Sequence, residues 1–494
     1  MSYGCAVIGG GVSGMTTAII MARQGYRTAL LESSGKTAPT IRGFTRRGLF
    51  FDTGFHYTGG LNEGEPLDIF FRYLGLSGKI EKYSFPEDGF DTFRCLEPRF
   101  EFTFPYGYDR IRKQLQDTFP QDARAIDIYL DAVRHVYRSQ PYIDLGAGGN
   151  MQRSLPGEGQ SLSGFLDGIT DNEILKCILS MHCLLHGVYP EEVSFLSHAC
   201  VAGSYYESAS GIKGGGSSLS EAFDVRLREL GVEVFCGAEV KEILLSADRS
   251  VSGLRFGDDK IINCERCVST IHPRQLLTLV PDQVFRPVYR KRLETLEDTC
   301  SAIILYVESD LPPGDLDRAN ILLFPSPRFN YPDGNGPVEE KPLFITHARQ
   351  DRSATPKEGY IVVCPEPNMG TEYWSAPVAD RSHAYRSYKE SMSRRITAYL
   401  ETAVPEFRGR ISHVECATPL TLKKYTHSPV GSIYGVKHKV EQYNPMPLTK
   451  IKNLFLAGQA ITAPGIMGAV VSGFLACGSA IGHERLIEEL RKWA

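Results

Sequence analysis

Three glycines near the start of the chain have the spacing of a phosphate-binding turn. Gly9, Gly11 and Gly14 form the pattern G-x-G-x-x-G within the stretch "VIGGGVSG". In this pattern the first glycine permits a tight turn, the second lets a pyrophosphate approach the backbone, and the third lets a helix pack closely against a strand. The N–H groups that begin the helix then bind phosphate oxygens. The spacing therefore predicts a phosphate-binding site.

A glutamate follows at the place where a nucleotide ribose is expected. The sequence predicts a strand at 6–8, a helix at 12–24 and a second strand at 26–31, which Glu32 closes. A carboxylate at the end of such a β-α-β unit accepts hydrogen bonds from a ribose diol. No arginine follows Glu32 directly, so a ribose 2′-phosphate is not expected. The unit predicts a dinucleotide and does not by itself distinguish FAD from NAD.

A glycine-rich segment late in the sequence bears on that choice. Residues 454–457 predict a strand that ends at Gly458, a loop with Pro464 and Gly465 follows, and a helix of small residues begins near Met467. The N-terminus of this second helix would receive another part of the same cofactor. NAD needs one such site, whereas FAD, with its ribityl chain and ring, often contacts two distant segments. We therefore expect FAD.

Five motifs resemble one family in their wording and in their order along the chain. The chain is similar to the phytoene desaturase, carotenoid isomerase and retinol saturase branch of the FAD-dependent oxidoreductases. The stretches "FDTGFHY" and "LFLAGQ" are most similar to the retinol saturase type. The motifs are "VIGGGVSG", "GLFFDTGFHYTGG", "GIKGGGSSLSEAF", "GVEVFCGAEVKEI" and "NLFLAGQAITAPGIMGAVVSG".

The resemblance implies a fold class and a set of cofactor contacts. The expected fold is α/β, with a Rossmann-type FAD-binding domain and a discontinuous α+β substrate domain. The glycine turn and Glu32 would hold the ADP half, Val240 would contact the adenine edge through its backbone, and the late segment would lie at the ribityl chain and flavin. The expected FAD contacts are Gly9, Gly11, Val12, Ser13, Gly14, Glu32, Ser33, Arg42, Gly54, Val240, Gly458, Gln459, Met467, Gly468 and Ala469.

Two positions depart from the family pattern. Ala38 and Pro39 stand where the family commonly has a glycine pair, and Gln459 and Ala460 follow the late glycine where an acid is often found. These departures leave open a non-enzymatic lipid escort on the same fold. Arg42 is the nearest cation that could contact phosphate or flavin, and the alternative is that it is a surface charge.

The motifs divide the chain into two interleaved domains. The FAD-binding domain is expected at 1–75, 205–290 and 412–494, and the substrate-binding domain at 76–204 and 291–411. Stretches 231–245 and 252–270 would add strands to the sheet of the first domain. The apolar and aromatic stretches of the second domain would either line a long tunnel or form an ordinary core.

One histidine is a candidate for catalysis. His56 follows Asp52, Thr53 and Gly54 in "FDTGFHY", and the resemblance places this stretch beside the flavin ring. A proton donor or a polarising group there would be chemically useful. The alternative is that His56 only orients the loop or the flavin.

No metal site is predicted from the remaining histidines and cysteines. Cys264 and Cys267 have the spacing of half a zinc site, but the sequence has no evident second pair at suitable spacing, and the two fall where a strand is expected. His182 and His186 are four apart, but no HExxH motif or nearby carboxylate completes a ligand set. We expect packing or a polar contact for both histidines.

Composition narrows the class of protein and of partner. Of the 494 residues 42% are hydrophobic and 23% are charged, as in an ordinary globular chain, and the net charge of -4 gives no indication of nucleic-acid binding. Twelve scattered cysteines and no recognisable leader favour a reducing cytoplasm. The terminal stretch "ERLIEELRKWA" predicts an amphipathic helix that docks on the protein body or makes peripheral membrane contact.

The sequence thus predicts a flavoenzyme for a hydrophobic small-molecule substrate. The expected reaction is saturation, desaturation or cis–trans isomerisation of a C=C bond in a polyene or isoprenoid, as in carotenoid biosynthesis. An enzyme of the amine-oxidase or protoporphyrinogen-oxidase type is the first alternative, and the lipid escort is the second. The sequence does not decide the direction of the reaction or the oligomeric state.

Overall fold

A computed structural model describes residues 2–145, 155–329, 336–348, 356–371, 374 and 383–494. Its centre is a five-stranded sheet in which every neighbouring pair of strands is parallel. The strand order is β10 (Glu233–Cys236), β3 (Thr28–Glu32), β2 (Cys5–Ile8), β14 (Cys267–Ser269) and β20 (Leu454–Leu456). The predicted strands at both ends of the sequence are confirmed, with bounds that differ by one or two residues.

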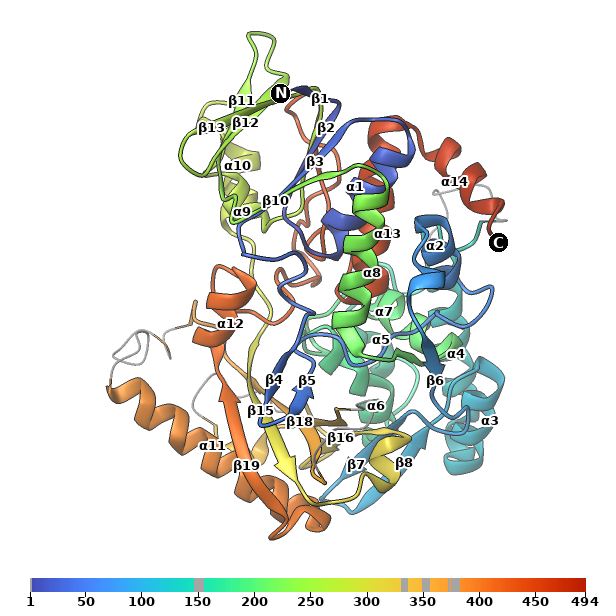
Figure 1. Cartoon of the computed structure of the whole chain (residues 1–494). Helices are drawn as coiled ribbons and strands as arrows, with labels where there is room; N and C mark the ends of the chain where they lie inside the picture. The colour runs from blue at the N-terminus through green and yellow to red at the C-terminus, as the bar shows by residue number, and fades with distance from the viewer. Residues whose placement is uncertain (1, 146–154, 330–335, 349–355, 372–373, 375–382) are drawn as a thin grey trace.

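Both faces of the parallel sheet are covered along β3, β2, β14 and β20, which explains why these strands are fully buried and mostly apolar, whereas the edge strand β10 is partly exposed. On one face Cys5 and Val7 pack among helices α1 (Val12–Arg23), α8 (Gly215–Glu229) and α13 (Gly465–Ile481). Figure 1 shows these three helices side by side, although they come from the start, middle and end of the sequence. On the other face Ala6 and Ile8 pack against a second, smaller sheet.

The smaller sheet corrects one prediction from the sequence. Stretches 231–245 and 252–270 give only β10 and β14 to the parallel sheet. The strands between them form a four-stranded sheet of their own, in the order β1 (Ser2–Tyr3), β13 (Lys260–Cys264), β12 (Val251–Phe256) and β11 (Val240–Leu245). Strands β11 to β13 are antiparallel neighbours joined by short turns, and connections this short cannot join parallel strands.

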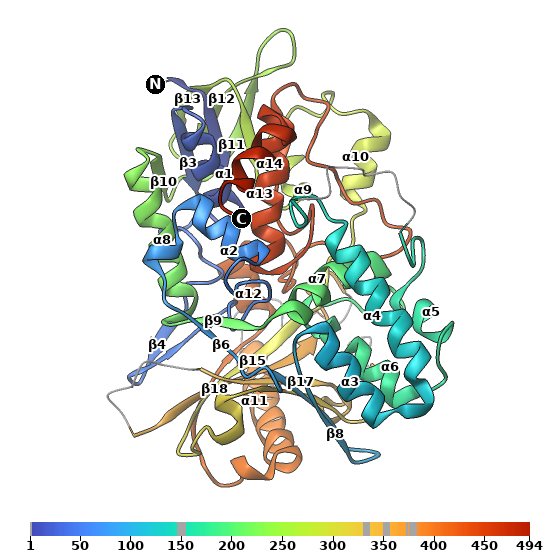
Figure 2. The same ribbon diagram turned by 90° about the vertical axis from the view of Figure 1, so that its right-hand side faces the viewer.

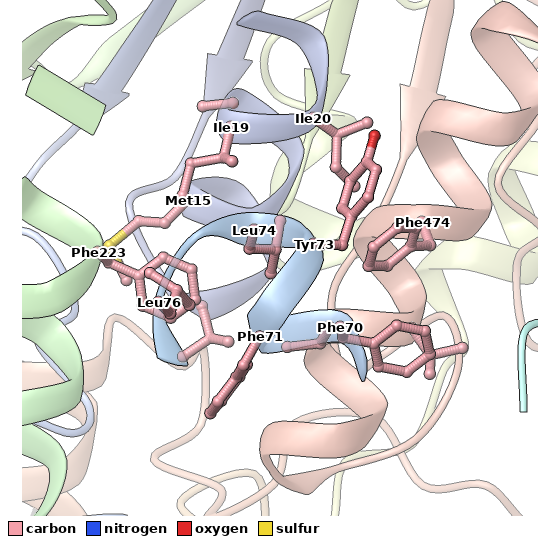
Figure 3. Packing of buried hydrophobic residues seen from close by; sticks show 14 of the residues in the cluster. Met15, Ile19, Ile20, Phe70, Phe71, Tyr73, Leu74, Leu76, Phe223 and Phe474 are labelled. Atoms are coloured by element: carbon pink, nitrogen blue, oxygen red, sulfur yellow. The ribbon is translucent and has the colours of Figure 1, made fainter. Parts of the chain in front are cut away.

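Helices α1, α2 (Pro66–Leu74) and α13 enclose the core beside the parallel sheet. Figure 3 shows Ile20 of α1, Tyr73 of α2 and Phe474 of α13 pointing toward one another. The Tyr73 and Phe474 rings are 5.5 Å apart. α14 (His483–Arg491) docks on this unit through Leu486 and Leu490, which are fully buried. No helix among the described residues is long and apolar enough to cross a membrane.

A seven-stranded mixed sheet forms the opposite end of the molecule. Helix α11 (His383–Ala403) covers one of its faces, and the hairpin β4 (Phe44–Arg46) and β5 (Leu49–Phe51) packs on the other. The strand order is β19 (Ile411–Ala417), β15 (Ser301–Ser309), β18 (Glu358–Glu366), β17 (Leu343–His347), β16 (Asn320–Phe324), β7 (Asp91–Cys95) and β8 (Phe100–Phe104).

Helices from the middle of the sequence pack against the β7–β8 edge of this sheet around an aromatic core. Figure 2 shows α3, α4 and α6 gathered on this side of the molecule. The helices are α3 (Tyr108–Thr118), α4 (Ala123–Arg138), α5 (Leu162–Asp167), α6 (Glu173–Ser180) and α7 (Phe195–Glu207).

Short elements connect these units. They are β6 (Lys82–Ser84), β9 (Ser210–Ile212), α9 (Pro273–Leu276), α10 (Pro287–Glu294), α12 (Pro419–Thr426) and the 3-10 turns η1 (Ser77–Lys79), η2 (Pro120–Asp122), η3 (Met181–Leu185), η4 (Gly314–Asp317), η5 (Val338–Glu340) and η8 (Pro405–Phe407).

Candidate active site

Two glycine turns meet at one edge of the parallel sheet. Strands β2 and β20 run in the same direction with β14 between them, so the turns that follow them lie at the same edge. Gly9 has a φ of 100° and Gly458 a φ of 116°, values that favour glycine. Thr270 lies between the turns, and its hydroxyl donates to the carbonyl of Ile8 at 2.9 Å. The structure therefore brings together the early and late segments that the sequence assigned to one cofactor.

The helices that follow these turns begin without a side-chain cap. The N-cap residues are Gly11 for α1 and Pro464 for α13, and neither helix has an acidic residue in its first turn. The Ser13 hydroxyl donates to the Ala469 carbonyl at 2.8 Å, which holds the first turns of the two helices side by side. Uncapped N–H groups at paired helix N-termini are suited to a group with several phosphate oxygens.

The first glycine turn has room for a pyrophosphate. A Cβ atom at Gly14 would lie 1.9 Å from the Gly9 carbonyl oxygen, so this glycine is required by helix–strand packing. A Cβ atom at Gly11 would meet no atom within 4 Å. Gly11 is therefore unnecessary for packing, and the space that its missing side chain leaves open fits the close approach of a phosphate. The residues present fit a dinucleotide.

Backbone N–H groups hold in place Glu32, the acid expected to bind the ribose. The Glu32 carboxylate accepts hydrogen bonds from the Gly10 N–H at 2.6 Å and from the Ser34 N–H at 2.7 Å. A carboxylate has about four acceptor sites, and the Ser33 hydroxyl occupies a third at 3.3 Å, so one stays available for a ribose hydroxyl. The Ala238 N–H donates to the Glu32 carbonyl at 2.8 Å, which places the start of β11, Val240, next to the ribose acid.

Two of the expected cofactor contacts lie at the periphery of this region. Ser33 is exposed, and its hydroxyl donates to Glu32 at 3.3 Å. Arg42 forms an ion pair with Asp224 of α8 and donates from Nε to the Thr37 carbonyl at 2.6 Å. The charge of Arg42 is therefore balanced within the protein.

Ala38 retains the backbone shape of the glycine that the family commonly has here. Its φ is 52°, in the left-handed region, and its N–H donates to the Gly10 carbonyl at 2.8 Å. The side chain is fully buried. The departure at this position therefore changes the residue and preserves the path of the chain beside the glycine turn.

The start of α13 borders an apolar cavity. The cavity has a volume of about 70 Å³ and is partly open to solvent, so it is an apolar opening smaller than a typical ligand site of roughly 300–1,000 Å³. Its walls come from α7, α13 and the loop after α4, with Val201, Ile143 and Leu475 among the lining residues. Met467 and Gly468, both expected at the flavin, also line it. The expected flavin contacts and the cavity thus share the start of α13.

Gln459 and Gly468 are fixed by different contacts. Gln459 is exposed, and its carbonyl is 2.9 Å from Nε2 of His438. A Cβ atom at Gly468 would lie 2.2 Å from the Ala463 carbonyl oxygen, so this position requires glycine for the close turn into α13.

The loop after β5 carries His56 to the seven-stranded sheet. The His56 ring is 5.9 Å from the ring of Phe344 on β17. The loop is pressed against α7, because a Cβ atom at Gly59 would lie 2.2 Å from the backbone of Ser204. At Gly54 a Cβ atom would lie 2.5 Å from the Thr40 carbonyl oxygen. Tight backbone packing therefore fixes where the His56 side chain can lie.

Asp52 is a chemically notable residue that the sequence analysis did not select. Burial raises the pKa of its carboxyl to about 7, while a hydrogen bond from the Gly216 N–H, 2.8 Å long, acts in the opposite direction. A carboxyl that titrates near neutrality can hold or release a proton at physiological pH. The available signal in the sequence was its position in "FDTG", directly after a strand. Its hydrogen-bond partner Gly216 belongs to the motif "GIKGGGSSLSEAF".

Two further polar residues at the glycine turns were also missed. Thr270 bridges the turns, as described above, and the Ser472 hydroxyl accepts from the Gly458 N–H at 2.7 Å. Thr270 belongs to none of the five motifs and acts on backbone 262 residues away. Ser472 lies in the last motif, 14 residues after Gly458, but residue type and spacing did not mark it as a partner of the turn.

Residues 12–308 match the family model described as flavin containing amine oxidoreductase. The chain belongs to this family. The suspected family and the α/β fold are thereby confirmed, and the protein is an FAD-dependent oxidoreductase.

Curated relatives span nearly the whole chain of this flavin-containing oxidoreductase. It is 25% identical over 524 residues to an all-trans-retinol 13,14-reductase of Danio rerio, covering 97% of this chain and 86% of the relative. It is 23% identical over 503 residues to a 4,4′-diapophytoene desaturase of Staphylococcus aureus, covering 93% of this chain and 94% of the relative.

Solved structures with the same fold are more distant in sequence. An oxidoreductase from Methanosarcina mazei has a TM-score of 0.66 at 15% identity, covering 96% of this chain and 99% of that chain. A putrescine oxidase bound to putrescine has a TM-score of 0.66 at 14% identity, covering 97% of this chain and 98% of that chain. At this level of identity the likeness shows the fold alone.

Proposed function

We propose that this FAD-dependent oxidoreductase acts on a carbon–carbon double bond of a hydrophobic polyene or isoprenoid. The observation that carries the proposal is the apolar cavity that shares the start of α13 with the expected flavin contacts. Relatives named for reduction of retinol and desaturation of diapophytoene cover more than nine-tenths of the chain. A polyene offers few polar handles, so apolar burial of roughly 25 cal/mol per Å² would supply its affinity.

The proposed roles follow from the geometry of each group. FAD, when bound, supplies hydride exchange with a substrate carbon. Gly9 to Gly14 and the start of α13 would bind its phosphates, and Glu32 would bind the ribose. Asp52 and His56 are the two titratable groups of the motif expected beside the flavin, and either would hold the proton that saturation or desaturation requires. The apolar cavity wall would exclude water from the reacting carbons.

The division into domains and the cellular location are also proposals. A cofactor domain at 1–75, 205–290 and 412–494 would contain all five strands of the parallel sheet. Its last segment would also contain most of β19, which starts at Ile411 and pairs with β15 in the seven-stranded sheet. Free cysteines and an ordinary charge balance support a cytoplasmic protein. The exposed Trp493 after α14 supports peripheral membrane contact.

Mass analysis of products tests the proposed reaction. The FAD-loaded protein, reduced and oxidised in parallel, is incubated without oxygen with retinol and with an acyclic carotenoid precursor. The expected result is conversion of one polyene with a gain of two hydrogens, a loss of two, or a changed retention time at constant mass. Putrescine and protoporphyrinogen serve as comparison substrates. Turnover of either of these, with no conversion of any polyene, would contradict the proposal in favour of an amine-oxidase or protoporphyrinogen-oxidase type.

A further inference from the structure

Three metal-ligating side chains converge inside the helical region, outside the two glycine turns. Cys183 and His186 come from η3 and the residue that follows it, and His198 comes from the first turn of α7. One ligand atom of each lies within 4.8 Å of the other two. The His186 Nε2 and His198 Nδ1 atoms are 3.2 Å apart, and the Cys183 Sγ and His198 Nδ1 atoms are 3.8 Å apart. All three side chains are buried.

The hydrogen bonds around His198 decide which of its nitrogens is free. The Tyr129 hydroxyl donates its single proton to the Leu179 carbonyl at 2.9 Å, so its oxygen can only accept from His198 Nε2, 3.0 Å away. His198 therefore carries its proton on Nε2, and the bare Nδ1 lone pair points at the cluster. Without a metal, both the Cys183 thiol and the His186 N–H aim at this one lone pair. A neutral imidazole nitrogen can satisfy one donor well, not two.

Two of the three spacings between ligand atoms match tetrahedral coordination, and the third lies within 4.8 Å. Zinc bonds of about 2.0–2.1 Å to nitrogen and about 2.3 Å to sulfur place two imidazole nitrogens about 3.3 Å apart and a nitrogen and a sulfur about 3.6 Å apart. The two observed distances, 3.2 and 3.8 Å, are close to these values. We propose that Cys183, His186 and His198 bind one zinc ion.

The surroundings provide one of the two histidines, His198, with the outer support that metal-bound histidines usually have. A ligating imidazole is commonly oriented by a hydrogen bond from its other nitrogen. Tyr129 provides this bond to His198, and Tyr129 is itself held by the Tyr206 hydroxyl at 3.0 Å. His186 Nδ1 is buried and has no hydrogen-bond partner among the described residues. The cluster has three protein ligands in the described part of the chain, so the fourth position belongs to water or to a small ligand.

Binding follows a simple proton balance. The Cys183 thiol releases one proton to solvent and binds as the thiolate. His198 binds through its bare Nδ1 without losing a proton. His186 moves its proton from Nε2 to Nδ1 and binds through Nε2, and the site with its ion has a net charge of one.

The ion would link two elements that form the cavity wall. Leu185, which lies between Cys183 and His186, and Val201 of α7 both line the apolar cavity. Zinc would fix η3 against α7 and so fix the shape of this wall. His182 is not part of the site, because its Nε2 is 3.1 Å from the Asp91 carboxylate and its ring stacks on Phe90. The sequence had paired His182 with His186 and gave no sign that His198 joins them.

Metal analysis of the intact FAD-loaded protein tests the site. The protein is expressed with added zinc, purified without chelators and dialysed, and zinc and FAD are measured in the same sample. The expected result is about one zinc per chain, falling to less than about a tenth in Cys183→Ser and in His198→Gln. Cys177→Ala is the matched control, because Cys177 is equally buried on α6 and lies outside the cluster. Its zinc content should equal that of the unmodified protein.

A measurement on the unmodified chain keeps the test decisive should the variants fail to fold. Cobalt exchanged into the protein should give a thiolate-to-metal charge-transfer band, and X-ray absorption of the zinc form should show one sulfur at about 2.3 Å with nitrogen neighbours at about 2.0–2.1 Å. Two results would overturn the proposal. One is a zinc content below about a tenth of an ion per chain after the protein has been incubated with zinc and the excess removed. The other is a cobalt spectrum without a thiolate band. Neither outcome depends on polyene turnover, so the reaction and the metal site can fail separately.

Discussion

The cofactor end and the cavity end of the molecule are built on different principles. At the parallel sheet, backbone groups make the site: glycine turns, uncapped helix starts and two N–H groups on Glu32. Around the cavity and the histidine cluster, side chains from several segments make it. The first kind of site depends on local conformation, which a short motif encodes. The second depends on which residues, distant in the sequence, meet in the fold. Substitutions at the glycine turns should therefore change FAD binding, and substitutions in the cavity should change substrate turnover.

The largest effects are expected at the glycine turn. Gly14→Ala forces a Cβ atom against the Gly9 carbonyl and should destabilise the fold by about 1–3 kcal/mol or more, with loss of FAD. Gly11→Ala meets no protein atom, so the FAD-free protein should keep its melting temperature while FAD retention falls at least about tenfold. The measurements are flavin absorbance per chain and thermal unfolding.

Gly35→Ala is the control for this pair, since its added Cβ atom would also meet nothing within 4 Å and it lies outside the turn. Equal FAD retention in the Gly11 and Gly35 variants would mean that backbone approach does not define the cofactor end.

Removing the charge of Glu32 should have the next largest effect, on the Kd for FAD. In Glu32→Gln one of the two backbone N–H groups faces an amide NH₂, and the charge-assisted bonds to the ribose are lost. Bonds to a charged group contribute about 1.5–3 kcal/mol, so the Kd for FAD should rise roughly 10- to 100-fold. Flavin fluorescence titration measures this. Glu233→Gln, at a half-exposed carboxylate on β10, should leave the Kd unchanged.

Filling the cavity should separate substrate binding from cofactor binding. Val201→Trp places a large ring in the apolar space and should lower kcat/KM for the polyene at least about tenfold. The FAD content should not change, because the residue lies outside the glycine turns. Val288→Trp, on an exposed position, is the control. An unaltered kcat/KM in the Val201 variant would place the substrate elsewhere.

A titration prediction concerns Asp52, which lies between the two regions. Its folded pKa is about 7 against an ordinary value of 3.8, so the folded state retains a proton that the unfolded state releases in this window. Stability should therefore fall as pH rises from about 4 to 7, by at most about 1.4 kcal/mol per pH unit, and level off above 7. Asp52→Asn should lack this slope. Urea unfolding at several pH values compares the two proteins, and parallel profiles would contradict the assignment.

The smallest effect is expected at Ala38. An L residue at a φ of 52° is strained, so Ala38→Gly should raise the free energy of unfolding by a few tenths to about 1 kcal/mol. Ala38→Val should lower it, because a branched side chain tolerates this backbone region less well. Denaturant unfolding of the three proteins checks the order, and a less stable glycine variant would refute the argument.

These contrasts explain what the sequence could predict. Gly9, Gly14 and Glu32 belong to one β-α-β unit, so local spacing predicted their arrangement. The placement of β11 to β13 in a separate sheet was missed because strand pattern does not specify which sheet a strand joins. Asp52 was missed because its pKa depends on burial by chain segments far away in the sequence.

The histidine cluster shows the same limit more clearly. His186 and His198 are joined only after α7 folds back on η3, and Tyr129, which sets the tautomer, comes from α4. No spacing rule connects these three positions. Packing, and not local pattern, brings them together.

The crossing of α1 and α13 has a consequence for how the protein is made. The Ser13 hydroxyl reaches the Ala469 carbonyl, and a side chain at Gly473 would collide with Thr16, so the first helix of the chain packs closely on one that is translated near the end. During synthesis the first glycine turn emerges long before its partner. The part of the first sheet that α13 covers therefore stays uncovered until β20 and α13 have been translated, and we expect FAD to bind only after that point.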